Sequence, residues 1–285
     1  MLEMAADAAA VAQLWQPLEL TQPEVYEQVQ DDFLLNLSFW ANIALAGISI
    51  LVFLYMGRNL ENSKSKLIFV ATLMVPLVSI SSYTGLASGL TISFLEMPPG
   101  HALAGEEVLT MWGRYLTWAL STPMILLALG LLAGTNLTKL FTAITADIAM
   151  CVTGLAAALT VSSHGLRWFW YFLSCTFFLV VLYILLVEWP KDAEAAGTAE
   201  IFNLLKILTV VMWLGYPIVW GLGAEGLAVL EAVWITSWAY SVLDIVAKYI
   251  FAFLLLNWLV SNESIISEFG WSADTGAGAA TPADD

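Results

Sequence analysis

Hydrophobic residues dominate seven long runs of the chain, and each run holds the roughly 20 mostly apolar residues that a membrane-spanning helix requires. The runs cover residues 34–57, 66–89, 108–134, 137–161, 166–189, 199–222 and 232–260. The links between them are short, apart from residues 90–107, and leave no room for a soluble domain. The pattern therefore predicts an all-α integral membrane protein, with one antiparallel seven-helix bundle as its transmembrane domain at 34–260.

Basic residues are distributed unevenly over the links, and this bias predicts orientation because cytoplasmic links carry the excess of Lys and Arg. The odd-numbered links or their edges hold Arg58, Lys64, Lys66, Lys139 and Lys191. The even-numbered links hold only Arg167, at the edge of the fifth run. We therefore expect the N-terminus outside the cell and the C-terminus in the cytoplasm.

The two ends of the chain are more polar than the seven runs. Residues 1–33 are expected to form an extracellular acidic segment, with a short amphipathic cap at "AADAAAVAQLW". This segment lacks the basic start and long apolar stretch of a secretory signal. Residues 261–285 are expected to form a cytoplasmic tail, and its "SADTGAGAATPADD" is typical of disorder.

Composition supports a membrane protein and argues against several other classes. The chain is 60% hydrophobic and 12% charged, with a mean hydropathy of +0.82. Its formal net charge of −15 fits a salt-loving source and argues against nucleic-acid binding. Cys151 and Cys175 lie in apolar runs without His or Cys at ligand spacing, so neither a metal site nor a disulfide framework is expected.

Asp244 and Lys248 lie near the middle of the last apolar run, in "VLDIVAKYIF". An ionised group at membrane depth costs about 3 kcal/mol or more, so such groups are usually paired and functional. Positions i and i+4 share one helix face and lie within reach of each other. We therefore predict that these two residues form a functional pair.

The third run carries Arg114, Thr117 and Ser121 at i, i+3 and i+7, on one helix face. An isolated Ser or Thr in a helix usually only hydrogen-bonds the carbonyl one turn back. A buried guanidinium needs acceptors, however, and it makes this face polar and hydrated.

Aromatic side chains form a stripe in the sixth run, with Trp213, Tyr216 and Trp220 beside Pro217. Such a stripe is more often ordinary core packing. Next to a proline that frees a backbone carbonyl, it also suits the wall of a slot for a flat conjugated ligand. Trp118 and "RWFWYF" at 167–172 offer further planar surfaces.

Four other polar residues are weaker candidates. Asp147 has no obvious cationic partner and is expected to be a neutral or hydrogen-bonded carboxyl that tunes its surroundings. Lys206 lies near the cytoplasmic end of the sixth run and can extend to the interface. His101 and His164 fall in external links and are expected to be solvated.

The stretches "RYLTWALSTP" in the third run and "DIVAK" in the last resemble the microbial rhodopsins, and the resemblance covers about 34–260. Pro76, Pro123 and Pro217 match the family's prolines in its second, third and sixth helices. The resemblance implies that Lys248 binds all-trans retinal as a Schiff base, with Asp244 as part of the counter-ion. It further implies a retinal pocket lined by Trp118, Thr122, Trp170, Ser174, Trp213 and Tyr216.

Positions 117, 121 and 128 distinguish the transported ion within that family. Its proton pumps carry Asp at the position of Thr117, a second carboxylate at that of Ala128 and a release glutamate at that of Thr236. This chain lacks all three, and Thr117, Ser121 and Ala128 form the pattern of the family's chloride pumps. The resemblance therefore implies light-driven inward chloride transport by a transporter rather than an enzyme.

The charges of these residues also favour an anion. A protonated Schiff base on Lys248 and the guanidinium of Arg114 contribute +1 each, and Asp244 contributes −1. About +1 is left in a low-dielectric interior, where Coulomb interactions are strong. Thr117 and Ser121 add hydroxyl donors without charge, so chloride or another halide is expected to bind there together with Arg114.

An exit path and a hinge are further expectations. Thr209 and Lys206 are candidates for guiding the anion through the cytoplasmic half, by their position in the sixth run. Pro217 and neighbouring Gly215 would let this helix tilt open.

Three alternatives stay open at this point. A photosensory receptor of the same fold would signal to a membrane transducer, but such receptors carry a carboxylate at position 117. A sodium pump would carry Asn, Asp and Gln in the third run. A retinal-free transporter could also use an Asp–Lys pair, and the colour of the purified protein tests this. The resemblance implies a homotrimer among the lipids of the cell membrane of a halophilic archaeon, without a signalling partner.

Overall fold

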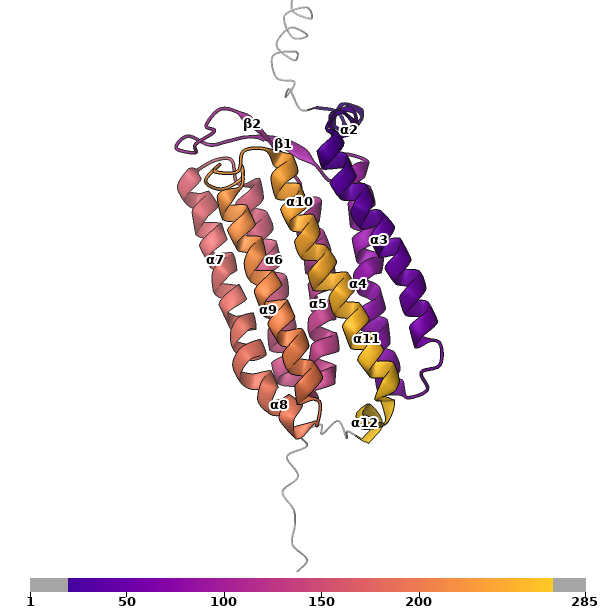
Figure 1. Ribbon diagram of the computed structural model, residues 1–285. Coiled ribbons are helices and arrows are strands. Elements are labelled where there is room, and N and C mark those ends of the chain that lie inside the picture. The colour runs from indigo at the N-terminus through magenta and orange to yellow at the C-terminus, as the bar shows by residue number, and fades with distance from the viewer. Residues whose placement is uncertain (1–19, 269–285) are drawn as a thin grey trace, which may run out of the picture.

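The computed structural model describes residues 20–268. Seven helices in this part of the chain are long and apolar enough to cross a membrane, which confirms the predicted spans. They run side by side in one bundle (Figure 1). In chain order they are α3 (Phe33–Gly57), α4 (Ser63–Ala87), α5 (Gly113–Ala133), α6 (Leu137–Leu159), a fifth span (His164–Ala195), α9 (Ala199–Leu222) and a seventh span (Val233–Ser261).

The fifth and seventh spans each contain a wider, π-helical turn. The fifth joins α7 (His164–Tyr183), η1 (Ile184–Glu188) and α8 (Trp189–Ala195). The seventh joins α10 (Val233–Asp244), η2 (Ile245–Ile250) and α11 (Phe251–Ser261). Such turns are rare and often occur at functional sites. The segment η2 begins directly after Asp244 and contains Lys248, so the irregular turn coincides with the predicted pair.

Helix α5 is the most enclosed of the seven spans. In its most apolar stretch 67% of the residues are buried, against 28% in α3 and in α9. The other helices turn large apolar side chains outward, and Leu51 and Phe172 are 69% and 62% exposed. In a bilayer these side chains face hydrocarbon, while the helices satisfy their own backbone hydrogen bonds. The polar face of the third run is therefore carried by the helix that is best shielded from lipid.

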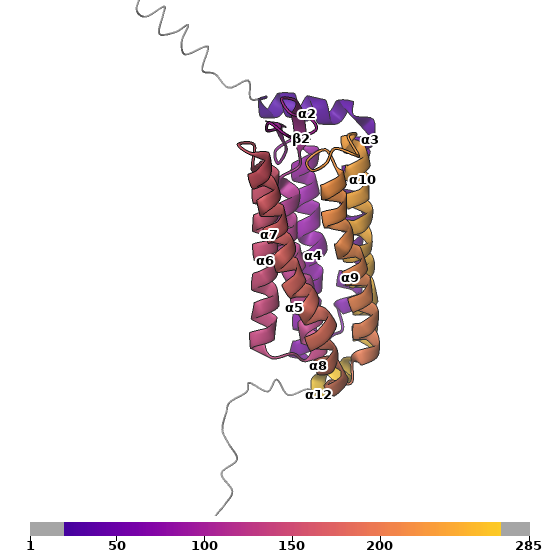
Figure 2. The same ribbon diagram turned by 90° about the vertical axis from the view of Figure 1, so that its left-hand side faces the viewer.

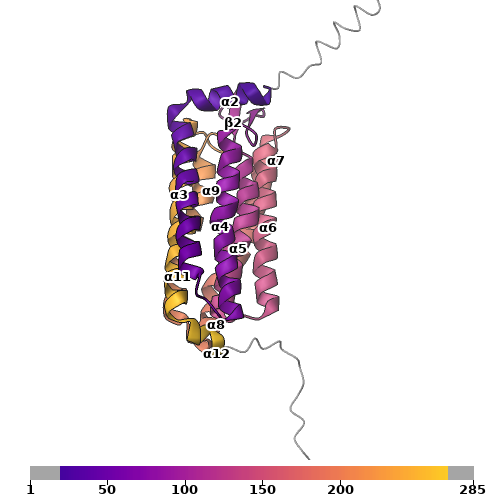
Figure 3. The ribbon, with the colours of Figure 1, turned by 90° about the vertical axis from the view of Figure 1, so that its right-hand side faces the viewer.

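Helix α2 (Gln22–Asp31) lies across one end of the bundle, which we call the α2 end (Figures 2 and 3). A capping box stabilises its first turn, and Val25 and Val29 bury its apolar face. Gly89 has a φ of +69°, and a Cβ at this position would lie 2.9 Å from the backbone nitrogen of Tyr26. Glycine therefore allows α2 to pack closely on the bundle.

The long link at the α2 end contains a small antiparallel sheet, β1 (Ser93–Glu96) with β2 (Glu107–Thr110). This hairpin was not predicted from the sequence, and the all-α prediction describes the membrane-spanning part. Residues 22–31, which the sequence analysis placed in an acidic segment, form a packed helix. The predicted amphipathic cap at 5–15 and the C-terminal stretch at 272–285 lie outside the described residues.

The opposite end, which we call the α12 end, carries the short helix α12 (Glu263–Glu268). Oε1 of Glu263 accepts hydrogen bonds from the backbone nitrogens of Glu61 and Asn62, at 2.9 and 2.7 Å. Ile266 is buried in the core beside them. The chain after the seventh span is thus fastened to the link between α3 and α4.

Candidate functional site

Asp244 and Lys248 form a buried ion pair where α10 meets η2. Nζ of Lys248 lies 2.9 Å from Oδ1 of Asp244, and the two side chains are 1% and 2% exposed. The hydroxyls of Tyr83 and Tyr216 donate to the carboxylate at 2.7 and 2.6 Å, which offsets part of the cost of burying the charge. Nζ lacks hydrogen-bond geometry towards any partner in the described part of the chain, so the amine retains bonding capacity.

Arg114 lies near this pair, at the start of α5, and only 3% of the residue is exposed. Its Nη1 donates to the hydroxyl of Tyr83 at 3.1 Å, and its Nη2 donates to Oγ of Ser237 at 2.9 Å. Tyr83 in turn donates to Asp244, so one hydroxyl joins the guanidinium to the carboxylate. The structure thereby brings together two cationic groups and one carboxylate, as the sequence predicted.

Thr117 and Ser121 follow on the same face of α5, both buried. Oγ1 of Thr117 donates to the carbonyl of Gly113 at 2.9 Å, the ordinary bond of a helical threonine. The hydroxyl of Ser121 has no partner among the described residues. Ser82 on α4 places its hydroxyl against that of Thr117. Ser82 was not predicted as a site residue, because its neighbours Ser79, Ser81, Tyr83 and Thr84 also carry hydroxyls and nothing local distinguishes it.

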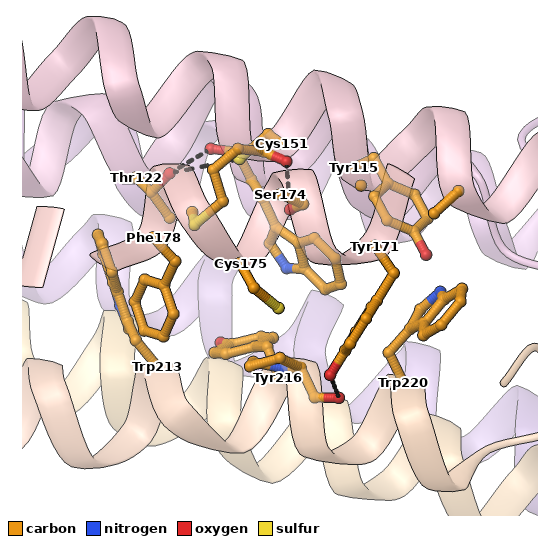
Figure 4. Close-up of a pocket in the computed structure, with 15 residues that line it drawn as sticks. Tyr115, Thr122, Cys151, Tyr171, Ser174, Cys175, Phe178, Trp213, Tyr216 and Trp220 are labelled. Carbon is orange, nitrogen blue, oxygen red and sulfur yellow. Dashed lines mark hydrogen bonds between the residues drawn. The ribbon is translucent and has the colours of Figure 1, made fainter. Parts of the chain in front are cut away.

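A cavity of about 90 Å³ lies between α5, α6, α7 and α9 (Figure 4). This volume is several times the roughly 10–15 Å³ that one water molecule needs. Its walls are aromatic, sulfur-containing and aliphatic, with few polar atoms. Of the predicted pocket residues, Trp118, Thr122, Ser174, Trp213 and Tyr216 line it.

The prediction that Trp170 lines the pocket is wrong for this cavity. Helix α7 instead presents Tyr171, Ser174 and Phe178. With 3.6 residues per turn, Trp170 lies roughly a quarter turn from the centre of that face. It packs against a buried cluster that contains Tyr115, Ala157, Ala158 and Trp220.

The cavity and the ion pair are joined through Tyr216. Its ring lines the cavity and lies 5.2 Å from that of Trp118, centroid to centroid, while its hydroxyl bonds Asp244. Lys248 does not itself line the cavity, but its buried amine lies at the same carboxylate. A slot with aromatic walls and an amine with free bonding capacity fit a conjugated aldehyde that attaches to lysine.

Asp147 lies beside the cavity on α6 and is fully buried. Its Oδ2 accepts a 2.6 Å hydrogen bond from Thr122, and its Oδ1 has no partner in the described part of the chain. The expectation of a hydrogen-bonded carboxyl is confirmed. Its effect on the surroundings stays a prediction.

The prediction that His101 is solvated is wrong. His101 is 5% exposed, its Nδ1 accepts from the backbone nitrogen of Leu103 at 3.1 Å, and its ring lies 5.5 Å from that of His164. His164 is half-buried and accepts a hydrogen bond from Trp168. Burial, together with the charge of Arg167, lowers the pKa of His101. His101 lies in the loop that joins β1 and β2, and this loop packs against the start of α7, which local sequence does not reveal.

Arg167 is fully buried at the α2 end, although the sequence placed it at the edge of a run. Its guanidinium donates to the carbonyls of Ala158, Thr160 and Glu225, at 2.8, 3.1 and 2.7 Å. Burial raises the pKa of the Glu225 carboxyl, which accepts a hydrogen bond from Tyr115. These contacts fasten the loop before α10 to the bundle.

Polar groups are sparse between Lys248 and the α12 end. The hydroxyl of Thr209 is fully buried and has no partner among the described residues, and Ala128 is also fully buried. Lys206 is half-buried and donates to Asn203 at 2.7 Å. A Cβ at Gly215 would lie 2.7 Å from Leu243, so this glycine brings α9 close to α10.

Comparison with known proteins identifies a matching family and similar relatives within it. Residues 33–262 match the model of a family described as bacteriorhodopsin-like protein. Halorhodopsin of Halorubrum sodomense is 71% identical over the full length of both chains. A solved structure described as halorhodopsin, a light-driven chloride pump, is 63% identical with a TM-score of 0.82, covering 83% of this chain and 99% of that one. A bromide-bound form of halorhodopsin from Halobacterium salinarum is 62% identical with a TM-score of 0.82, covering 84% and 99%. The similarity to the chloride-pumping branch that Thr117, Ser121 and Ala128 predicted is confirmed.

Proposed function

This chain belongs to the bacteriorhodopsin-like protein family, and we propose that it is a light-driven pump that moves chloride into the cell. It is a multi-pass membrane protein and an ion transporter rather than an enzyme. The halorhodopsins that it resembles over its full length support this function.

One observation in the site carries the proposal most directly. Arg114 and Lys248 face a single carboxylate, Asp244, through the contacts of Tyr83 and the ion pair. Thr117 and Ser121 supply hydroxyls where a proton pump needs an acceptor carboxylate. The surplus positive charge in a low-dielectric interior attracts an anion, and donors without charge suit a halide.

Lys248 is the residue that would hold retinal, as a Schiff base, with Trp118, Thr122, Ser174, Trp213 and Tyr216 along its length. Retinal bound there would supply absorption of visible light and, on isomerisation, a displaced positive charge. Asp244, held by the hydroxyls of Tyr83 and Tyr216, would balance that charge at rest. The apolar walls exclude water from the site.

Chloride binds between Arg114, Thr117 and Ser121, on the α2 side of Lys248, and Ser82 adds a fourth contact. The α2 end faces the outside, as the distribution of Lys and Arg predicts. The anion leaves towards the α12 end past Thr209 and Lys206. Pro217 and Gly215 allow α9 to tilt during this step. The protein acts as a homotrimer among the lipids of the cell membrane.

The visible spectrum with and without chloride tests the proposal. Adding chloride to halide-free, retinal-loaded protein should shift the visible band, whereas sulfate, which is larger and more strongly hydrated, should do little. In vesicles, light should drive chloride inward, and an uncoupler should preserve or increase the passive proton flux. Identical titrations in the two salts, or a pH change abolished by the uncoupler while chloride stays still, would contradict a chloride pump.

A further inference from the structure

A chain of buried hydroxyls joins Arg114 to the first membrane helix. Nη2 of Arg114 donates to Ser237 at 2.9 Å, the hydroxyls of Ser237 and Ser38 lie 2.7 Å apart, and Ser38 donates to the carbonyl of Leu35 at 2.6 Å. Both serines are 0% exposed. We call these two residues the serine relay.

The direction of the serine relay follows from counting protons. A guanidinium has no acceptor, so Ser237 receives a hydrogen bond from Arg114. Ser38 has one hydroxyl proton, which it gives to the carbonyl of Leu35. The proton between the two serines therefore belongs to Ser237. Each hydroxyl in the relay both donates and accepts, and the relay ends on a backbone carbonyl that cannot move without α3.

A second arm draws the same guanidinium in another direction. Nη1 donates to Tyr83, which donates to Asp244. Ser237 precedes Asp244 by seven residues on α10, which corresponds to about 10 Å along the helix axis. Among the described residues Arg114 forms no ion pair within 4.0 Å. The guanidinium is thus held between the two arms and stops short of the carboxylate.

We propose that Ser38 and Ser237 are positioning residues that hold Arg114 away from Asp244, so that its charge stays available to the anion. The inference rests on the proposed chloride site. Without the relay, an N–H of the guanidinium loses its acceptor in a buried place, and the Asp244 carboxylate is the charged acceptor that Tyr83 already connects to it. Direct pairing of the two would cancel the positive charge that attracts chloride.

Chloride titration of the visible band tests this role. Ser237→Ala should weaken chloride binding by about tenfold, because it removes the hydrogen bond that Arg114 donates. Ser38→Ala should weaken it by about threefold, because it removes only the acceptor that orients Ser237. The double variant should match Ser237→Ala alone, since both act through one relay. Ser237→Thr keeps the hydroxyl and should restore most of the affinity.

Ser241→Ala is the matched control. Ser241 lies one turn further on α10 and is also 0% exposed, and among the described residues its hydroxyl donates to the backbone carbonyl of Ser38, at 3.4 Å. This variant should leave the chloride affinity within about twofold. An equal loss in Ser241→Ala and Ser237→Ala would reduce the relay to general packing and overturn the proposal.

A second measurement does not depend on chloride. The chain has three arginines, Arg58, Arg114 and Arg167, so their side-chain ¹⁵N resonances can be assigned by single substitutions. In chloride-free protein, Ser38→Ala and Ser237→Ala should both shift the Nη resonances of Arg114 and leave the other two unchanged. Unshifted Arg114 resonances would refute the positioning role. If the wild-type protein shows no chloride-dependent band shift, the proposed function is refuted instead. The Arg114 resonances then test on their own whether the serine relay positions the guanidinium.

Discussion

The bundle differs on the two sides of Lys248. Towards the α2 end, a continuous network joins Asp244, Tyr83, Arg114 and Ser237 and continues to α3. Towards the α12 end lies the largest apolar cluster among the described residues, with Ala128, Leu129, Leu205, Phe251 and Leu255 all buried. The first side contains fixed charges and oriented donors, whereas the second is packed with aliphatic and aromatic side chains.

This difference assigns different tasks to the two halves. Under the proposed function the resting anion binds on the α2 side, where the buried charge of Arg114 and the unpartnered hydroxyl of Ser121 lie. On the α12 side a resting anion would lose its hydration without compensation. The hydroxyl of Thr72 there donates to the carbonyl of Ile68 on its own helix, at 2.7 Å, and that of Thr209 has no partner in the described chain. We therefore expect the α12 half to be the barrier that opens after light absorption.

Loss of Lys248 should have the largest effect. Lys248→Ala, produced with added retinal, should be colourless, because no other lysine lies near mid-membrane. It should also lose about 3–5 kcal/mol of stability, since Asp244 becomes a buried charge without its cation. Absorption spectroscopy of the purified protein measures the first effect. Lys206→Ala should keep its colour, and a stable visible band in Lys248→Ala would disprove the attachment site.

Thr117→Asp should come next, because it places a fixed charge in the anion site. Two negative charges about 4 Å apart repel by about 4 kcal/mol at an effective dielectric of 20. Chloride affinity should therefore fall by a factor on the order of 100–1,000. The new carboxylate is also a proton acceptor, so flash photolysis should detect a blue-shifted, deprotonated state.

Thr117→Val tests the loss of the hydroxyl alone, without the negative charge that Thr117→Asp adds. It should weaken chloride binding by only about tenfold, the value of one hydrogen bond to a charged ligand, and yield no deprotonated state. If Thr117→Asp keeps the wild-type chloride titration, the anion binds elsewhere and Thr117 only packs.

Thr209→Val should have a smaller effect that is confined to the barrier half. The substitution keeps the shape but removes the buried hydroxyl that could help an anion leave. Light-driven chloride flux in vesicles should fall by about threefold to tenfold, while the chloride affinity in the dark stays within about twofold. Thr72→Val removes a hydroxyl that bonds its own helix and should leave the flux unchanged. A changed dark affinity in Thr209→Val would place this residue in the resting site.

The smallest expected effect concerns pH at the α2 end. Burial lowers the pKa of His101, so the folded state favours the neutral ring. The folded state is therefore most stable above about pH 6.5, and this stability declines as the pH falls below that value. Glu225 opposes this trend, because its raised pKa makes the folded state gain protons on acidification. Between pH 7.5 and 5.5 the midpoint of thermal bleaching should fall by about 1–3 °C more in the wild type than in His101→Gln.

His164→Gln serves as the control for this comparison. It removes the neighbouring ring but keeps His101, and it should retain most of the wild-type decline, because burial is the largest cause of the lowered pKa of His101. The groups that face His101 are His164, Arg167 and Glu225. Parallel profiles for the wild type and His101→Gln would show that the buried histidine does not control the response.

The sequence by itself determined the spans and the chemistry along each of them. Apolar run length predicted seven helices, because the hydrocarbon thickness sets a local requirement that one segment meets alone. The pair Asp244 and Lys248, and the face with Arg114, Thr117 and Ser121, followed from the helical repeat. Both patterns are properties of single helices, and the structure brings the Asp244–Lys248 pair and the Arg114 face together as expected.

Only the tertiary structure decided which residues meet between helices. Ser82 against Thr117, and Ser38 against Ser237, join positions that are 35 and 199 residues apart. The choice of Tyr171 over Trp170 as a cavity wall depends on how α7 is rotated. The burial of His101 depends on how the loop between β1 and β2 packs against His164 at the start of α7. Rotation about the helix axis and axial register are set by the packing of several helices at once, so a repeat within one segment cannot specify them.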